Sequence, residues 1–255
     1  MEKVNYINSR GLNLVGNLYI TNPHSNSIII MCHGFTGNKH EIGRFDIAAT
    51  KFHDKGYNVL NFDFSGSGES DDDTLTVGKQ VDDLESTIKY VQDKGYSNIA
   101  LLGLSLGGLV SLKVYNPKIK SLVLWAPVTA AHKNYCNRFN TEQLQELNES
   151  GYITRTRTKG VRKKILIDPQ IIKDRENVDQ KYLCSRINCP VLIVHGDQDD
   201  RIPLQNSIDA LQYFPKNSRL EIISGADHLF FDQVNQFIDL SVEWYKHYFP
   251  INSSN

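Results

Sequence analysis

Short apolar runs alternating with segments of helical periodicity restrict the fold of this chain more than any other feature. The runs have hardly any polar interruption, which is typical of strands buried on both faces of a parallel sheet. Such alternation predicts an α/β fold with a mostly parallel, doubly wound sheet. Residues 12–19 alternate apolar and polar side chains, which predicts an antiparallel strand at its start. The apolar runs are 28–32, 59–62, 99–102, 122–125 and 191–194, and the helical segments are about 39–55, 77–94, 106–115, 204–214 and 231–248.

The alternation is interrupted between Trp125 and Pro190, where no strong apolar run occurs. A loop of that length without structure of its own would be unusual in a compact domain. We therefore expect residues 128–183 to form an inserted cap on a core made of residues 1–127 and 184–255. Within the cap, the pattern favours helices near 141–149 and 169–176 and a hairpin over 153–167 that turns at Lys159-Gly160.

Composition and charge limit the partners of the chain. Of 255 residues, 40% are hydrophobic and 22% charged, which is enough for one folded core. The formal net charge of -1 argues against attraction to nucleic acid or to an anionic membrane. The first 18 residues have no apolar run typical of a signal peptide, and no stretch is long enough to span a bilayer. We expect a cytoplasmic protein with a small-molecule substrate that is neutral or mildly anionic, and we leave a homodimer open.

The cysteines do not follow a metal-site or disulfide pattern. There are four, at positions 32, 136, 184 and 189, with no C-x-x-C pair. Cys184, Cys189 and His195 could share a metal, but a closed site needs four ligands. We expect reduced thiols, no metal and no cofactor.

A G-x-S-x-G pattern occupies residues 103–107, between a strand-like run and a helical segment. Sites of doubly wound folds lie at the carboxyl ends of the strands. Glycines flank a nucleophile on such a sharp turn because side chains there would clash. This context predicts Ser105 as a catalytic nucleophile.

A serine nucleophile needs a base and an orienting carboxylate. Of the eight histidines, His228 follows the last predicted strand, residues 220–223, and is the predicted base. The acid is expected after the preceding strand, in the order Ser, acid, His. Asp199 is our choice, with Asp197 as the fallback; Asp197 and Asp200 are expected to shape the turn or cap the next helix.

Acyl transfer also needs hydrogen-bond donors for the developing oxyanion. The segment after residues 28–32 is His33-Gly34-Phe35-Thr36-Gly37, so the backbone N–H groups of Phe35 and Leu106 are the predicted pair. We expect His33 and His195 to be structural.

Two further patterns have ordinary interpretations. Gly66-Ser67-Gly68 lacks the third glycine of a dinucleotide-binding loop, so it predicts a turn. The basic stretch could hold an anionic substrate or partner, but the balanced net charge favours a solvated hairpin face. This basic stretch comprises Arg155, Arg157, Lys159, Arg162, Lys163 and Lys164.

Together these residues resemble the α/β-hydrolase superfamily over nearly the whole chain. The segments 33–37 and 103–108 are similar to those of bacterial carboxylesterases and monoacylglycerol lipases. The segments 61–70 and 225–228 and the cap resemble bacterial cinnamoyl and feruloyl esterases more closely. The resemblance implies a triad of Ser105, Asp199 and His228 and an oxyanion hole at Phe35 and Leu106.

The resemblance implies a serine carboxylic ester hydrolase that forms an acyl-enzyme on small esters, with hydroxycinnamoyl or short-chain acyl esters as candidates. Cinnamoyl esterases commonly have Gln after the nucleophile, whereas this chain has Leu106. Monoacylglycerol lipase, thioesterase, serine peptidase and carbon–carbon hydrolase activities use the same triad and stay open. A ligand-binding receptor of the same fold is the non-enzyme alternative. Serine at position 105 excludes haloalkane dehalogenase and epoxide hydrolase chemistry, because those enzymes need Asp at the corresponding turn.

Overall fold

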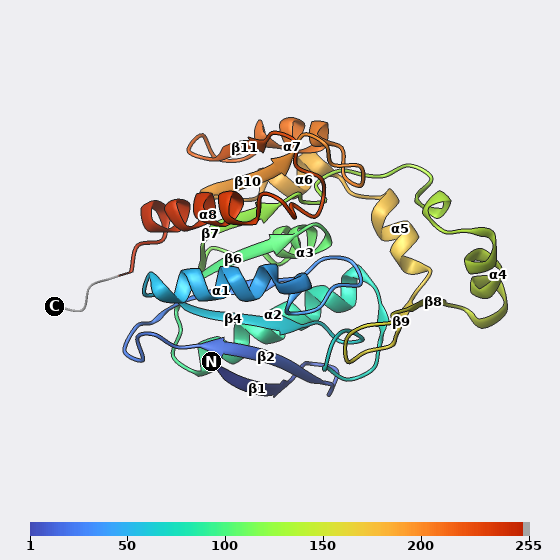
Figure 1. Cartoon of the computed structure of the whole chain (residues 1–255), viewed down its shortest axis with the longest axis horizontal. Coiled ribbons are helices and arrows are strands. Elements are labelled where there is room, and N and C mark those ends of the chain that lie inside the picture. The colour runs from blue at the N-terminus through green and yellow to red at the C-terminus, as the bar shows by residue number, and fades with distance from the viewer. Residues whose placement is uncertain (252–255) are drawn as a thin grey trace.

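A central sheet of eight strands organises the chain (Figure 1). The computed structural model describes residues 1–251. The spatial order is β1-β2-β4-β3-β6-β7-β10-β11; β1 and β2 pair antiparallel, as do β2 and β4, and all other neighbours are parallel. The strands are β1 (Glu2–Ile7), β2 (Asn13–Tyr19), β3 (Ser27–Cys32), β4 (Asn58–Asp63), β6 (Asn98–Leu104), β7 (Ile119–Trp125), β10 (Val191–Gly196) and β11 (Arg219–Ile223). The predicted doubly wound α/β sheet is confirmed.

Helices cover both faces of this sheet because alternate side chains of each strand point to opposite faces. On one face α1 and α8 pack on Ile29 and Met31 of β3, while α2, α3, α6 and α7 pack with Ile28 and Ile30 on the other. Figure 1 shows α1 and α8 together in front of the strands. The core helices are α1 (Arg44–Asp54), α2 (Val77–Asp93), α3 (Leu106–Val114), α6 (Gln180–Ser185), α7 (Leu204–Leu211) and α8 (Val234–Tyr248), and the 3-10 helix η1 (Glu41–Gly43) precedes α1.

The elements from η2 to α5, between β7 and α6, form a group of small elements at one end of the sheet (Figure 1). Strands β8 and β9 pair antiparallel, and β9 pairs with the two-residue strand β5 of the core. The N–H of Val77 donates to the Asp174 carboxylate at 2.9 Å, a second tie to the core. The elements are η2 (Tyr135–Arg138), α4 (Thr141–Ser150), β8 (Ile153–Thr156), β9 (Lys164–Ile167), α5 (Gln170–Glu176) and core strand β5 (Thr74–Leu75).

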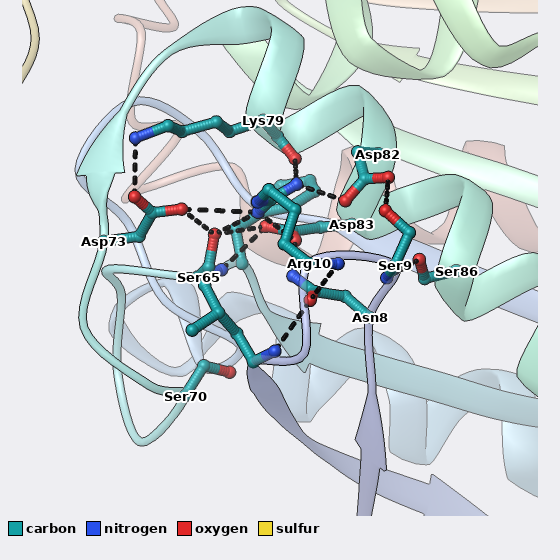
Figure 2. Close-up of polar contacts among 12 residues, drawn as sticks. Asn8, Ser9, Arg10, Ser65, Ser70, Asp73, Lys79, Asp82, Asp83 and Ser86 are labelled. Atoms are coloured by element: carbon teal, nitrogen blue, oxygen red, sulfur yellow. Dashed lines mark hydrogen bonds and ion pairs between the residues drawn. The ribbon is translucent and has the colours of Figure 1, made fainter.

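A network of ion pairs fixes the turn between β1 and β2 against α2 (Figure 2). The Arg10 guanidinium pairs with Asp82, with Asp83 at 2.8 Å and with Asp73 at 3.4 Å. Lys79 pairs with Asp73 at 2.5 Å. We call these five residues the Arg10 network.

No helix among residues 1–251 combines the length and apolar character needed to cross a membrane. The turn predicted at Gly66-Ser67-Gly68 is present, with both glycines at positive φ.

Candidate active site

Ser105 lies at the sharp turn between β6 and α3. Its φ of 54° and ψ of −112° are a backbone conformation that residues with side chains rarely adopt. The Ser105 N–H donates to the carbonyl of Trp125 at 2.8 Å, and its own carbonyl accepts from the N–H of Val128 at 3.0 Å. These two bonds to the end of β7 hold the strained turn in place.

The glycines around Ser105 are required by space. A Cβ at Gly103 would lie 2.6 Å from the carbonyl oxygen of Gly107, and a Cβ at Gly107 would overlap the carbonyl oxygen of Cys32. Both distances are below what real Cβ atoms tolerate, so the backbone could not turn so sharply with larger residues. The expectation of steric crowding around Ser105 is confirmed.

His228 follows β11 and contacts the carboxylate of Asp199, which follows β10. His228 Nδ1 lies 2.7 Å from Asp199 Oδ2. Because an ionised carboxylate can only accept, Nδ1 carries the proton and Nε2 is the free nitrogen. His228 and Ser105 line the same cavity, but their side chains form no hydrogen bond to each other in the described chain. Catalytic hydrogen bonds are often loose until substrate binds.

The Asp199 carboxylate is fully buried and has several donors. Its Oδ1 accepts from the backbone N–H groups of Arg201 at 2.8 Å and Ile202 at 2.9 Å. Burial raises the pKa of Asp199, but hydrogen bonds from His195, His228 and the backbone outweigh burial and hold this pKa well below its usual range. Asp199 is therefore an anion in front of the His228 ring.

His195 also contacts Asp199, a contact that the sequence did not reveal. Its Nε2 lies 3.1 Å from Asp199 Oδ2 and 3.0 Å from the carbonyl of Ile202, and its Nδ1 lies 2.7 Å from the hydroxyl of Ser207. The ring is fully buried, in keeping with a structural role.

The other two aspartates of this loop point elsewhere. Asp197 is exposed and accepts from the N–H of Gly225 at 2.7 Å and from the hydroxyl of Ser224 at 3.2 Å, so it shapes the turn before His228. Asp200 is exposed beside Arg201. Neither caps α7, whose N-cap position is Pro203 without a side-chain cap, so the helix-capping alternative is wrong.

The two predicted oxyanion donors line the same cavity as Ser105. Leu106 is the first residue of α3, and Phe35 is on the loop after β3. Neither N–H donates to an acceptor within the described residues. A Cβ placed on Gly34 would lie 3.4 Å from Ser105 Cβ, which shows how closely this loop approaches the serine.

His33 fixes the base of the Phe35 loop. Its Nε2 accepts from the N–H of Phe64 at 3.2 Å, so Nδ1 donates to the carbonyl of Gly34 at 2.9 Å. Burial lowers the pKa of His33, which keeps the ring neutral. These contacts agree with the structural role expected from the sequence.

A buried ion pair that sequence reasoning missed connects the Phe35 loop with the His228 loop. Glu41 Oε1 accepts from the N–H of Gly34 at 2.7 Å, and Glu41 Oε2 pairs with Arg44 at 3.0 Å. Arg44 also donates to the carbonyl of Leu229, next to His228, at 2.6 Å. We call Glu41 and Arg44 the loop clamp. An E-x-x-R spacing is too common to have indicated this role.

A cavity of about 730 Å³ brings these groups together. Ser105, Leu106, Phe35 and His228 line it from the core. Residues of the 128–183 segment line the rest: Val128, Tyr135, Arg138, Phe139, Gln143, 155–159, Ile167 and Arg175. The cavity is large enough for a small organic substrate.

The predicted solvated face of the basic stretch is correct for Lys163 and Lys164, which are exposed. It is wrong for Arg157, which donates to the carbonyl of Thr36, and for Arg162, which contacts Asp72 and the Ser70 carbonyl. Two further members are exposed yet line the cavity, namely Arg155 and Lys159. The prediction from net charge was wrong for these residues because the net charge is a sum over the chain and does not show where the charges lie.

The sheet order, the strained serine turn and the carboxylate–imidazole pair at the carboxyl ends of the strands define an α/β-hydrolase. The chain belongs to the Hydrolase_4 family, described as serine aminopeptidase, S33, whose model matches residues 23–182. By this family membership the chain is a hydrolase.

Individual relatives agree with this assignment. The chain is 26% identical to "Putative esterase/lipase 2" of Mycoplasma genitalium, over 84% of this chain and 89% of that protein. The α/β hydrolase GrgF from Penicillium sp. sh18 superposes with a TM-score of 0.79 at 19% identity, over 97% of this chain and 98% of the other. Est1E from Butyrivibrio proteoclasticus, solved with ferulic acid, gives a TM-score of 0.77 at 21% identity, over 96% and 98%.

Proposed function

We propose that the chain is a serine carboxylic ester hydrolase in which Ser105 is the nucleophile, His228 the base and Asp199 the group that orients the base. The observation that carries this proposal is the cavity that the strained Ser105 turn and His228 both line, with the ionised Asp199 bonded to Nδ1 of the His228 ring. The esterase relatives support the same reaction class.

In the proposed reaction, the Ser105 hydroxyl attacks the ester carbonyl while Nε2 of His228 takes its proton. The backbone N–H groups of Phe35 and Leu106 donate to the oxyanion, since neither is bonded within the described chain. His228 then protonates the departing alcohol, which leaves an acyl group on Ser105. Water activated by His228 releases the acid and restores the serine.

Labelling with a fluorophosphonate probe tests the nucleophile directly. We expect one label on Ser105, and none on Ser105→Ala. Labelling that is absent in folded protein, or that falls on another serine, would contradict the proposal. A panel of p-nitrophenyl esters of rising chain length, with methyl ferulate, an aryl thioester and an aminoacyl p-nitroanilide beside them, separates esterase from feruloyl esterase, thioesterase and peptidase activity.

Asp199→Asn should lower kcat by about 10³- to 10⁴-fold, because the amide no longer stabilises the protonated His228 ring. Asp200→Asn is the matched control, since Asp200 is exposed and adjacent in sequence. We expect its kcat to stay within about twofold of wild type. Comparable losses in both variants would remove Asp199 from its proposed role.

We also propose that residues 128–183 act as a cap that sets the size of the ester, on a core of residues 1–127 and 184–255. Ile167 of β9 is buried and lines the cavity. Ile167→Ala should shift the preferred acyl chain to longer homologues, whereas Val161→Ala, at an exposed position of the same segment, should not. An unchanged chain-length profile for Ile167→Ala would contradict the cap role.

A further inference from the structure

The cavity wall carries far more positive than negative charge. Among the described residues its only carboxylate is Glu41, and the loop clamp pairs that group with Arg44. The remaining basic side chains on the wall are Arg138, Arg155, Arg157, Lys159, Arg175 and Arg201. The whole chain has a net charge of -1, so the positive charge is concentrated at the cavity.

Most of these cations have no carboxylate partner in the described chain. Arg201 lies 4.0 Å from Asp200, but no ion pair involves Arg138, Arg155, Arg157 or Lys159. The partial desolvation of Arg155 in the cavity, together with the nearby Arg157 and Arg201, lowers the pKa of Arg155. The wall therefore carries an electrostatic cost that a bound anion would relieve.

Arg175 shows the imbalance most clearly, because it is buried as well as unpaired. It lies on α5, is only 3% exposed, and its Nη1 has no hydrogen-bond partner among the described residues. The neighbouring Glu176 carboxylate instead accepts from the N–H of Tyr135 at 2.8 Å. A buried cation without an acceptor is costly, and such groups are normally paired.

An aromatic ring places two of the arginines together. The guanidinium carbons of Arg175 and Arg138 lie 5.1 and 6.0 Å from the ring centroid of Tyr135, which itself lines the cavity. Arg138 Nη1 donates to the carbonyl of Arg201 at 3.2 Å, whereas Arg175 Nη1 has no partner among the described residues. Arginine edges match the paired oxygens of a carboxylate or phosphate.

We propose that this wall is a subsite for an anionic group of the substrate, a carboxylate or phosphate, bound by Arg175 with help from Arg138 and Arg155. The substrate class is thus an ester that carries a negative charge away from its scissile bond. This assignment of substrate rests on the proposed ester hydrolase function, whereas binding of the anion itself does not.

Anion binding can be tested without catalysis by thermal unfolding. Malonate or inorganic phosphate, at ionic strength matched with sodium chloride, should raise the Tm of the wild type in a concentration-dependent way by a few degrees. Arg175→Met and Arg155→Gln should respond clearly less. Lys163→Met, an exposed cation of the same hairpin that does not line the cavity, should respond like the wild type. An equal response of all four proteins would overturn the subsite.

Matched ester pairs test the substrate class. Mono-p-nitrophenyl adipate is compared with p-nitrophenyl hexanoate, and 1-butyrylglycerol 3-phosphate with 1-butyrylglycerol. We expect kcat/KM to favour the anionic member of one pair by at least tenfold, and this ratio to fall at least fivefold in Arg175→Met and Arg155→Gln. A preference for the adipate ester would place a carboxylate on the acyl side. A preference for the glycerol phosphate ester would place a phosphate on the alcohol side.

The two proposals fail in different ways. If Ser105 is not labelled and no ester in either pair is cleaved, the proposed function fails while the thermal response still tests the anion subsite. If neutral esters are cleaved as well as or better than both anionic ones, the subsite assignment fails and the hydrolase stands. Arg155→Gln keeps the test decisive should Arg175→Met not fold, because Arg155 is exposed.

Discussion

Basic side chains cluster in two regions of this molecule, and the two clusters differ in whether carboxylates pair with them. In the Arg10 network, each cation meets carboxylates of the same chain (Figure 2). On the cavity wall, Arg175, Arg138 and Arg155 have none within the described residues. Charges that hold a fold together are neutralised internally, whereas charges reserved for a ligand are left unsatisfied. The difference therefore separates structural cations from functional ones without reference to any relative.

The largest expected effect comes from breaking the Arg10 network. Arg10→Met leaves the fully buried Asp83 without its cation and should lower the free energy of unfolding by about 2–3 kcal/mol. Urea unfolding measures this change. Lys89→Met removes the exposed ion pair between Lys89 and Asp93 on α2, the helix that also carries Asp83. We expect this change to lower the free energy of unfolding by less than about 0.5 kcal/mol. Similar costs for the two variants would mean that the network is only a surface feature.

Removing an unsatisfied cation should have the opposite sign. We expect Arg175→Met to raise the free energy of unfolding by about 1 kcal/mol, because the buried charge disappears while the side-chain stem is kept. Arg186→Met is the control, since Arg186 also lies over a tyrosine, Tyr182, but is exposed. Differential scanning calorimetry without added multivalent anions compares them. A destabilised Arg175→Met would place Arg175 with the structural cations.

The smallest effect concerns a second internally neutralised site, where Glu69 pairs with Lys3 at 2.7 Å and with the buried Lys39 at 2.6 Å. These hydrogen bonds lower the pKa of Glu69 to about 2. A lowered carboxylate pKa stabilises the fold above about pH 4.5, and this contribution is lost as the pH falls toward 2. After allowance for the partial exposure of Glu69, we expect about 1 kcal/mol.

Comparing the free energy of unfolding at pH 7 and pH 3 in wild type and Glu69→Gln checks this effect. The wild type should lose about 0.6 kcal/mol more than the variant over this interval, because the rest of the contribution is lost only below pH 3, while the exposed Glu85→Gln should behave like the wild type. Parallel pH dependence in all three proteins would show that Glu69 does not contribute.

The parts of the fold that were predictable are those in which local pattern and burial coincide. Strands β3, β4, β6, β7 and β10 are buried along most of their length, so their apolar runs stand out in the sequence. Strand β1 was missed because only Val4 and Tyr6 of its six residues are buried. The two-residue strand β5 is too short to leave a pattern.

The candidate site divides in the same way. Ser105, Asp199 and His228 each follow a recognisable strand, so their positions could be predicted even though their roles await experiment. The loop clamp and the Tyr135 stack could not be foreseen, because their partners meet only in the folded chain. The unpaired state of Arg175 was equally hidden, since it depends on which carboxylates are absent nearby.

The loop clamp joins the carbonyl of Leu229 to Arg44, 185 positions away in the sequence, and through Glu41 to the N–H of Gly34. The Phe35 loop, which would stabilise negative charge, and the His228 loop, which would move the proton, are thus connected to each other through side chains and not only through the sheet. A loop transplanted from another hydrolase would lack the contacts that join it to Glu41 or Arg44. Glu41 and Arg44 must be transplanted together with the loop. Otherwise the Phe35 loop and the His228 loop will lose their relative positions.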